Sequence, residues 1–266
     1  MAKTLASARQ TQIRTMLKED KQVSIPELAA QFSVSAMTIR RDLDKLARDG
    51  QVRRTHGGAM PAERMVFEFD FASRRQAHRR QKQAIAREAL KLIQPGQRLI
   101  LDTGTTTLEL AYALKDFQDI TVITPSLAVA SVLQFSPQIQ TVLLGGIIQK
   151  GRPDLAGLVT EKNLEMFSAD IAFQGADGIG LDGTLYTVDM RIVEVDRKIR
   201  QQAQRTFVLA DSSKIGKTAL MTNGFIHEVE ALITDDKISA RQKKALEREG
   251  AKIIMVKTQK SSFPAS

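Results

Sequence analysis

The residues best suited to chemistry lie in short polar loops, each of which follows an apolar segment of the chain. The longest of these loops, residues 102–107, reads Asp-Thr-Gly-Thr-Thr-Thr and leads directly into a helical pattern. Hydroxyl groups and backbone N–H groups at the start of a helix suit a phosphate, and a neighbouring carboxylate accepts hydrogen bonds from sugar hydroxyls. We therefore expect an anion-binding site that contains Asp102, Thr103, Gly104, Thr105, Thr106 and Thr107.

Four later loops have the same polar character. They contribute hydroxyl, glycine, carboxylate and basic residues, namely Ser126, Gly145, Gly146, Arg152, Asp177, Asp211 and Lys214. Lys214 or Arg152 would contact a phosphate, while the carboxylates would hold hydroxyl groups. The alternative is that Ser, Thr and Gly at these positions only cap helices and shape turns.

Short apolar segments must position these loops. Seven strands are expected, at residues 98–101, 120–124, 140–144, 171–174, 206–210, 231–234 and 252–256. Helical patterns separate most of them, at residues 108–114, 127–133, 189–203 and 240–249. This alternation predicts an α/β domain with a doubly wound, largely parallel sheet. Ligands of such sheets bind beyond the carboxyl ends of the strands, so the convergence of five polar loops there favours a pocket for a polar anion.

Catalysis has little support in the sequence. The loop carboxylates Asp102, Asp177 and Asp211 are able to act as acids or bases, but carboxylates at strand ends also bind hydroxyls passively. The histidines at 56, 78 and 227 lie far apart, and the chain has no cysteine, which excludes a thiolate metal site and a thiol nucleophile. We expect no catalytic residues, no metal and no cofactor.

Two glycine patterns resemble nucleotide-binding motifs without their structural context. Residues 178–183 match the dinucleotide fingerprint, but the next helix is expected only near Asp189, whereas the fingerprint needs a helix that opens inside the motif. Residues 216–218, Gly-Lys-Thr, resemble the end of a P-loop, yet Asp211 stands where the leading glycine belongs. Neither pattern predicts a nucleotide site.

The positive charge of the chain is confined to its first third. Residues 1–94 contain 19 Lys and Arg against 10 Asp and Glu, whereas residues 95–266 contain 20 of each. Such an asymmetry indicates that the first third binds nucleic acid or another anionic surface.

The same third has the pattern of a helix-turn-helix unit. After a first helix near residues 9–18, Ser24 with Pro26 and Glu27 forms the start signal of a short helix at 26–32. Ser35 then caps a third, basic helix that runs to about Asp49. Two short helices joined by a tight turn are typical of units whose second helix enters the DNA major groove.

The third helix has an apolar face (Ile39, Leu43, Leu46) and a basic face that includes Arg48. Residues 51–59 follow, with alternating residues and a closing glycine pair that predict a β-hairpin wing. Expected base contacts come from Met37, Thr38 and Arg41, and expected contacts to phosphate or the minor groove come from Arg40, Arg53, Arg54 and His56. Ser35 and Lys45 are also expected in the DNA-binding surface. The alternative is a solvated helix in which Arg41, Lys45 and Arg48 pair with Asp42 and Asp44.

These segments resemble the DeoR family of bacterial transcriptional regulators. Residues 34–46 (VSAMTIRRDLDKL) and 54–59 (RTHGGA) are similar to its N-terminal signature. LDTGTT at 101–106, LLGG at 143–146, GADG at 175–178 and DSSK at 211–214 resemble its effector domains in the same order. The resemblance covers residues 9–256. It implies a winged helix-turn-helix followed by a domain that resembles sugar-phosphate isomerases and senses phosphorylated sugars or related metabolites, with the phosphate on residues 103–107 near Ser126 and Lys214.

The chain departs from the family pattern at three positions. Pro125 precedes Ser126 where the family usually has Asn, and Ile192 and Asp196 occupy the positions of a Glu and a Lys four residues apart on a helix. Loss of a cation and a carboxylate changes which ligand fits, so the sequence leaves the effector open. The same loss argues against isomerase activity.

Together these patterns predict four parts: a winged helix-turn-helix domain (1–60), a basic linker and connecting helix (61–94), an effector-sensing α/β domain (95–256) and a mobile tail (257–266). The linker is rich in arginine and lysine, at Arg74, Arg75, Arg79, Arg80 and Lys82. It either supports DNA binding or is a solvated connector.

The expected function is a sequence-specific regulator, and in particular a repressor of a sugar catabolic operon that a phosphorylated sugar relieves. Its partners would be duplex DNA, a small anionic effector and a second copy of the chain, since such units bind paired half-sites as dimers. The sequence has no run of 18 apolar residues, so we expect no membrane contact and a cytoplasmic location. The alternatives are an isomerase-like enzyme with an attached DNA-binding module and an RNA-binding first third.

Overall fold

The computed structural model describes residues 2–20, 22–49, 51–55, 57–61, 71, 73–149 and 152–258. The chain forms two compact units, which are described separately below. One comprises residues 1–73 with 150–152, and the other comprises residues 74–149 with 153–266.

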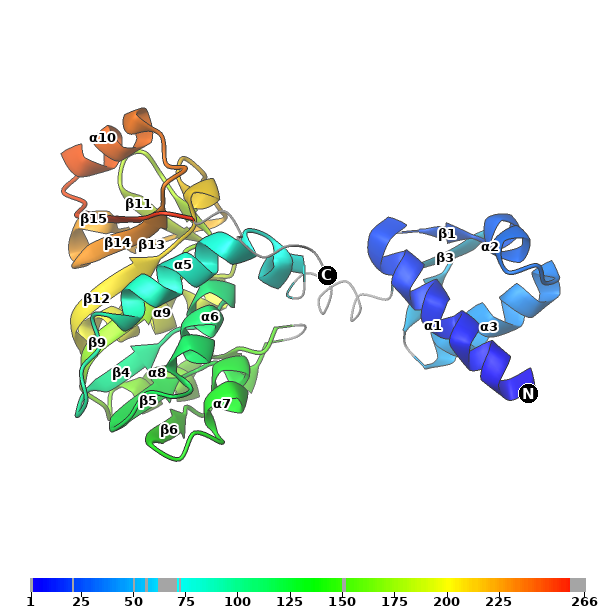
Figure 1. Ribbon diagram of the computed structural model, residues 1–266, viewed down its shortest axis with the longest axis horizontal. Coiled ribbons are helices and arrows are strands. Elements are labelled where there is room, and N and C mark those ends of the chain that lie inside the picture. Colours follow the sequence, from blue (N-terminus) through cyan, green and yellow to red (C-terminus); the bar gives the residue numbers. More distant parts are fainter. Residues whose placement is uncertain are drawn as a thin grey trace. The chain divides into compact units, whose positions relative to one another are not determined.

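The first unit is a winged helix-turn-helix. Its elements are α1 (Ala2–Asp20), β1 (Val23–Ser24), α2 (Ile25–Gln31), α3 (Ala36–Arg48), β2 (Val52–Arg54) and β3 (Gly58–Pro61) (Figure 1). Both predicted helix caps are present, because the Ser24 Oγ accepts from the Glu27 N–H at 3.3 Å and the Ser35 Oγ accepts from the Thr38 N–H at 3.2 Å. The first helix is longer than the predicted 9–18.

The predicted hairpin wing is confirmed, and β1 adds a third strand to it. The antiparallel order is β1-β3-β2. A Cβ at position 58 would lie 1.8 Å from the Val23 carbonyl oxygen, so only glycine lets β1 approach β3 this closely. Ile13, Leu28, Ile39 and Leu43 are fully buried between the helices and this sheet.

The second unit is built on a seven-stranded sheet whose order is β15-β14-β12-β9-β4-β5-β6. All neighbouring strands are parallel. The strands are β4 (Arg98–Leu101), β5 (Ile120–Thr124), β6 (Ile139–Leu143), β9 (Ala169–Gln174), β12 (Ala203–Leu209), β14 (Ala231–Asp235) and β15 (Ile253–Val256). They correspond one to one to the seven predicted strands, which confirms the doubly wound α/β architecture.

Helices cover both faces of this sheet. Figure 1 shows α5 (Arg79–Leu90), α6 (Thr105–Leu114) and α7 (Leu127–Leu133) in front of it, with α8 (Leu158–Leu164) and α9 (Val193–Gln201) behind it. Each face has its own buried apolar cluster, one centred on Leu99, Leu101 and Phe173 and the other on Ile100, Ala172 and Ile199. A third cluster joins α10 (Ala240–Arg248) to β12 and β14.

Short antiparallel pieces that the sequence analysis did not anticipate extend the unit. They are the pair β7 (Ile147–Ile148) and β8 (Leu155–Ala156), and the sheet β10 (Gly178–Ile179), β11 (Thr184–Thr187) and β13 (Met221–Phe225). The turns η1 (Met190–Ile192), η2 (Ser212–Lys214) and η3 (Ile226–Glu228) complete it. The glycines at 178–183 therefore belong to the β10–β11 hairpin rather than to a strand-to-helix turn.

The expected boundary at residue 95 is wrong. The helix assigned to the 61–94 connector is α5, and its residues Ile85 and Ala89 are fully buried in the main core of the α/β unit. The two units meet at residues 73 and 74. In the expected mobile tail, Thr258 donates to Asp236 at 2.8 Å, and residues 259–266 lie outside the described part of the chain. None of the helices described has the length and apolar character that a bilayer span requires.

Candidate functional site

The exposed face of α3 carries cations without internal counter-ions. Arg40, Arg41 and Lys45 are exposed, and none of them has an ion pair with the described residues. Met37 lies at the start of the same helix with 54% of its surface exposed. Ser35 and Thr38 hold the first turn, where their hydroxyl oxygens are 3.0 Å apart. The helix thus presents positive charge and an apolar side chain at its N-terminal end.

The two aspartates of α3 have partners outside their own helix. Buried Asp42 accepts from the Arg9 Nε at 2.6 Å and from the Gln10 Nε2 at 2.8 Å, which joins α1 to α3. Asp44 pairs with Arg54 of the wing. The alternative in which Arg41 and Lys45 pair with these aspartates is therefore wrong. Arg48 contacts Asp44 only through the backbone carbonyl, at 3.4 Å.

Three wing residues are predicted to contact DNA, and the structure describes the side chain of one of them, Arg54. The Arg54 guanidinium donates to the Arg40 carbonyl at 3.1 Å in addition to its pair with Asp44, so it attaches the wing to α3. This is a structural role, and the DNA contact of Arg54 stays a prediction. The side chain of Arg53 and the whole of His56 lie outside the described residues.

In the α/β unit, three adjacent strands bring three of the predicted loops together. β4, β9 and β12 are neighbours in the sheet, so the segments that follow them, 102–107, 175–177 and 211–214, meet at the same edge. A hydrogen bond of 3.1 Å from the Gly175 N–H to the Asp102 Oδ2 joins the first two segments.

The loop predicted to bind an anion leads into the start of α6. Gly104 precedes it with a φ of +109°, and no side chain caps the helix. The Thr107 Oγ1 donates instead to the carbonyl oxygens of Thr103 at 2.9 Å and of Gly104 at 3.0 Å. The first N–H groups of a helix have no acceptor within the helix. Those of Thr105 and Thr106 are thus oriented toward whatever lies beyond the helix start.

The carboxylates of the other two loops are already hydrogen-bonded. Asp177 accepts from the Arg74 Nη2 at 2.8 Å and from the Val188 N–H at 3.1 Å. The Asp211 Oδ1 caps η2 by accepting from the Ser213 N–H at 3.1 Å. Lys214 is half-buried on the same turn. These loops therefore provide one half-buried cation beside the start of α6.

Two further predicted loops follow β5 and β6, which continue the parallel sheet from β4, so they lie at the same edge. Buried Ser126 follows β5 and caps α7, where its Oγ accepts from the Val129 N–H at 3.3 Å. Gly145 and Gly146 follow the edge strand β6, and a Cβ at 146, where φ is +148°, would lie 2.0 Å from the Thr160 Oγ1. These glycines allow close packing against α8, which is the turn-shaping alternative. Arg152 belongs to the segment 150–152, which groups with the other unit.

The structure adds two cations that the sequence analysis assigned to the linker. A helix that precedes a parallel strand runs opposite to it, so α5 begins at the edge where the strands end. Arg74 contacts Asp177 there, and the Lys82 Nζ donates to the carbonyl oxygens of Arg74 and of Ala77, the latter at 2.8 Å. Burial lowers the pKa of Lys82 to about 8 against the opposing effect of Asp211, and the charges of Lys214 and Arg74 lower it further. The sequence predicts a connecting helix before the strand at 98–101. The direction of such a helix, opposite to that of the strand, could have placed its first residues at this edge of the sheet.

Asp196, one of the departures from the family pattern, lies in a buried polar network. It is 3% exposed and accepts from the Asn223 Nδ2, while its Oδ1 has no hydrogen-bond partner among the described residues. Burial raises the pKa of Asp196 well above its usual value, and the charge of Asp102 raises it further. Ile192, the second departure in this segment, is buried in the apolar cluster behind the sheet.

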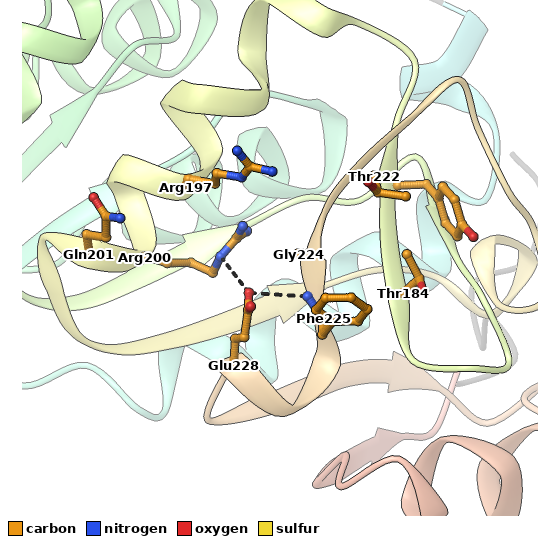
Figure 2. A pocket seen from close by; sticks show the side chains of 9 residues that line it. Thr184, Arg197, Arg200, Gln201, Thr222, Gly224, Phe225 and Glu228 are labelled. Carbon is orange, nitrogen blue, oxygen red and sulfur yellow. Dashed lines mark hydrogen bonds and ion pairs between the residues drawn. The ribbon is translucent and has the colours of Figure 1, made fainter.

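Arg200 connects this network to a surface cavity. Its side chain, 9% exposed, donates to the Gln174 Oε1 at 3.0 Å and to the Asn223 carbonyl. Figure 2 shows Arg197 and Arg200 on one side of a cavity of about 490 Å³ and Phe225 and Glu228 on the other. The Glu228 Oε2 lies 3.6 Å from the Arg200 Nε and accepts from the Phe225 N–H at 3.2 Å. Arg200 thus positions Asn223 by donating to its carbonyl oxygen, and the Asn223 side chain donates to Asp196.

Comparisons with known proteins match the two units to separate family models. A family model described as the DeoR-like helix-turn-helix domain matches residues 9–64, and one described as the DeoR C terminal sensor domain matches residues 77–236. A putative aga operon transcriptional repressor of Escherichia coli O157:H7 is 29% identical and covers 95% of each chain. The glycerol-3-phosphate regulon repressor of Escherichia coli K12 is 32% identical over 83% of this chain and 87% of its own. Ribose 5-phosphate isomerase A of Methanocaldococcus jannaschii aligns with 52% of this chain and 55% of its own, at 21% identity and a TM-score of 0.39.

The buried carboxyl of Asp196 predicts a pH-dependent stability. Because its pKa is raised in the folded state, the folded protein holds a proton that the unfolded chain has already lost. Stability from this group is therefore lost as the pH rises from the unfolded pKa through the folded one. An Asp196→Asn variant should lack this loss.

Chemical denaturation of both proteins between about pH 4 and pH 8 measures the effect. Between the unfolded-state and folded-state pKa values of Asp196, the free energy of unfolding of the variant should rise relative to that of the wild type by up to about 1.4 kcal/mol per pH unit. Parallel pH profiles would contradict a protonated Asp196.

Proposed function

Because the chain belongs to the DeoR family of transcriptional regulators, we propose that it is a DNA-binding repressor controlled by a phosphorylated metabolite bound to its α/β unit. The observation that carries the DNA-binding part is the exposed face of α3, where Arg40, Arg41 and Lys45 have no ion pairs with the described residues. Phosphate oxygens of a duplex are the natural counter-ions of such a face. Met37, Thr38 and Arg41 are placed near the start of the helix, the part that reads base edges in helix-turn-helix units.

The proposed effector site lies where β4, β9 and β12 end. Its support is the start of α6, which has no side-chain cap, together with the half-buried Lys214 after β12 and Asp102 after β4 at the same edge of the sheet. A phosphorylated metabolite combines a dianion for the helix start with hydroxyls for the carboxylates. Relatives named as repressors of the aga operon and of the glycerol-3-phosphate regulon support a role in controlling the use of such a compound, and we propose a sugar-use operon.

Control would work by a shift between conformations. A ligand changes DNA affinity only to the extent that it binds the two conformations differently. An isomerase reaction at this site has less support, since Ile192 and Asp196 stand where the family has a Glu and a Lys, and Ile192 is buried in apolar surroundings.

We also propose that the α/β unit forms the contacts of a homo-oligomer. Apolar side chains are exposed side by side on β7 and at the start of α8: Ile147 is 70% exposed, Ile148 63%, Leu158 67% and Val159 55%. These residues form one patch, because β7 pairs with β8, which leads directly into α8. Contiguous exposed apolar surface of this kind marks protein interfaces.

The role of Arg41 is tested by an Arg41→Ala variant. The loss of a base-edge contact should weaken binding to the specific site by roughly 1–3 kcal/mol and relax sequence preference. Fluorescence anisotropy on a footprinted fragment from upstream of the gene and on a random duplex measures both. Arg87→Ala, which removes an exposed arginine of α5, is the charge-matched control and should bind like the wild type. Equal losses on the two duplexes would contradict base reading by Arg41.

The interface is tested by an Ile147→Asp variant, because a buried carboxylate opposes association. Light scattering after size-exclusion chromatography should show a smaller assembly than that of the wild type, with an unchanged circular dichroism spectrum. Phe135→Asp, at an exposed apolar residue outside the patch, should leave the assembly intact. An Ile147→Asp protein of wild-type mass would refute the assignment.

A further inference from the structure

The end of α5 brings two cations to the proposed effector site from the segment that follows the DNA-binding unit. Arg74 is the first residue of the α/β unit, and Lys82 lies in the first turn of α5. Neither belongs to the strand-end loops in which ligands of α/β sheets are usually sought. Both nevertheless lie at the edge where those loops meet, because Arg74 contacts Asp177 after β9 and the charge of Asp211 after β12 acts on Lys82.

Lys82 is an unusual residue for the interior of a protein. Its side chain is 4% exposed, and its Nζ donates to the carbonyl oxygens of Arg74 and Ala77. An ammonium group has three N–H donors, so two carbonyls leave one donor for a further acceptor. Lys82 has no ion pair with any described residue. A buried cation is costly to maintain unless an anion compensates it. The charges of Asp211 and Glu109 act on Lys82 without forming an ion pair with it, so its remaining N–H is available to an anionic partner.

The neighbouring charges point to the same conclusion. Lys214 is half-buried, and burial and the nearby charge of Arg74 both lower its pKa. The charges of Arg74 and Lys214 thus disfavour the protonated form of Lys82, and the charge of Arg74 disfavours that of Lys214. Carboxylates of the chain also act on this group: Arg74 binds Asp177, Arg79 lies 3.7 Å from Glu109, and the charges of Asp211 and Glu109 favour the protonated form of Lys82. A dianion is the ligand whose binding relieves repulsion among three cations.

We propose that Lys82 and Arg74 bind the anionic group of the effector, together with Lys214 and the start of α6. The inference rests on the proposed function and deepens it, because it assigns the ligand class as a phosphate-bearing dianion. It also assigns ligand contacts to the segment that connects the two units. Arg74 follows directly on Ser73, the last residue of the helix-turn-helix unit. An effector that draws the Arg74 guanidinium away from Asp177 therefore acts on the chain that leads to the DNA-binding unit.

A purely structural role for Lys82 makes a different prediction. If the ammonium only holds the turn at residues 74–78 through its two carbonyl bonds, its loss would lower stability without a specific effect on anion binding. Inorganic phosphate is a suitable probe, because it carries the proposed anionic group and no other recognition feature. The pH dependence of its binding separates the roles further, since Lys82 loses its proton near pH 8.

The experiment is a calorimetric titration of the full chain with inorganic phosphate. Lys82→Met and Arg74→Gln should each weaken binding by roughly tenfold or more, the effect expected for loss of a charge-assisted hydrogen bond. Lys91→Met, which removes an exposed lysine at the other end of α5, is the matched control and should bind like the wild type. Lys82→Arg should retain binding, because it keeps the cation.

The same titration repeated above pH 8 tests protonation directly. Phosphate binding should draw a proton onto Lys82 in the wild type, which appears as a dependence of the measured heat on the ionisation enthalpy of the buffer. In Lys82→Arg, whose guanidinium is always protonated, this contribution should disappear. Proton uptake that persists unchanged in Lys82→Arg would overturn the assignment of Lys82.

The outcomes separate this inference from the proposed function. Phosphate binding by the wild type that survives unchanged in folded Lys82→Met and Arg74→Gln overturns the inference and leaves the anion-sensing function in place. Failure of the wild type to bind either phosphate or phosphorylated sugars overturns both.

Discussion

The parallel order of β12, β9 and β4 is the constraint on which the proposed sensor site depends. Parallel strands end at the same edge, so three segments separated by up to about a hundred residues meet there. The hydrogen bond from the Gly175 N–H to Asp102 fixes two of these segments to each other. The same geometry acts on α5, because a helix that leads into a parallel strand must begin where the strands end. One topological rule thus assembles the start of α6, the η2 turn and the beginning of α5.

A second feature of the α/β unit is the burial of two ionisable side chains, Asp196 and Lys82. Desolvation shifts Asp196 and Lys82 in opposite directions, raising the pKa of the carboxyl and lowering that of the ammonium. Both groups are held by neutral partners, Asn223 in one case and backbone carbonyls in the other. Buried ionisable groups of this kind respond to the charge of whatever binds beside them. In the DNA-binding unit the opposite arrangement holds, since the aspartates of α3 are paired and the exposed cations are not.

The elements that the sequence predicts correctly are those with a strong local signal. The seven strands were predicted because fully buried parallel strands are short apolar runs, and α2 and α3 were predicted from their Ser24 and Ser35 caps. The small antiparallel strands were missed because two-residue pieces such as β7 and β10 have no periodicity. For the glycines at 145 and 146 the sequence predicts ligand contacts, with turn shaping as the alternative. It gives no local sign of their close packing, in which a Cβ at 145 would lie 2.9 Å from the Asn163 Oδ1 and one at 146 would lie 2.0 Å from the Thr160 Oγ1. The sequence places Lys82 and Arg74 in a linker that either supports DNA binding or is a solvated connector, because charge composition alone does not reveal burial.

The most direct test of the account compares a phosphorylated sugar with its unphosphorylated counterpart. Both are titrated into the full-length protein bound to a labelled fragment of its own upstream DNA, and release of the DNA is followed by anisotropy. The account predicts that a member of a panel of phosphorylated sugars releases the DNA, while the same sugar without its phosphate leaves the complex intact. Release by the two forms at equal concentrations would contradict it.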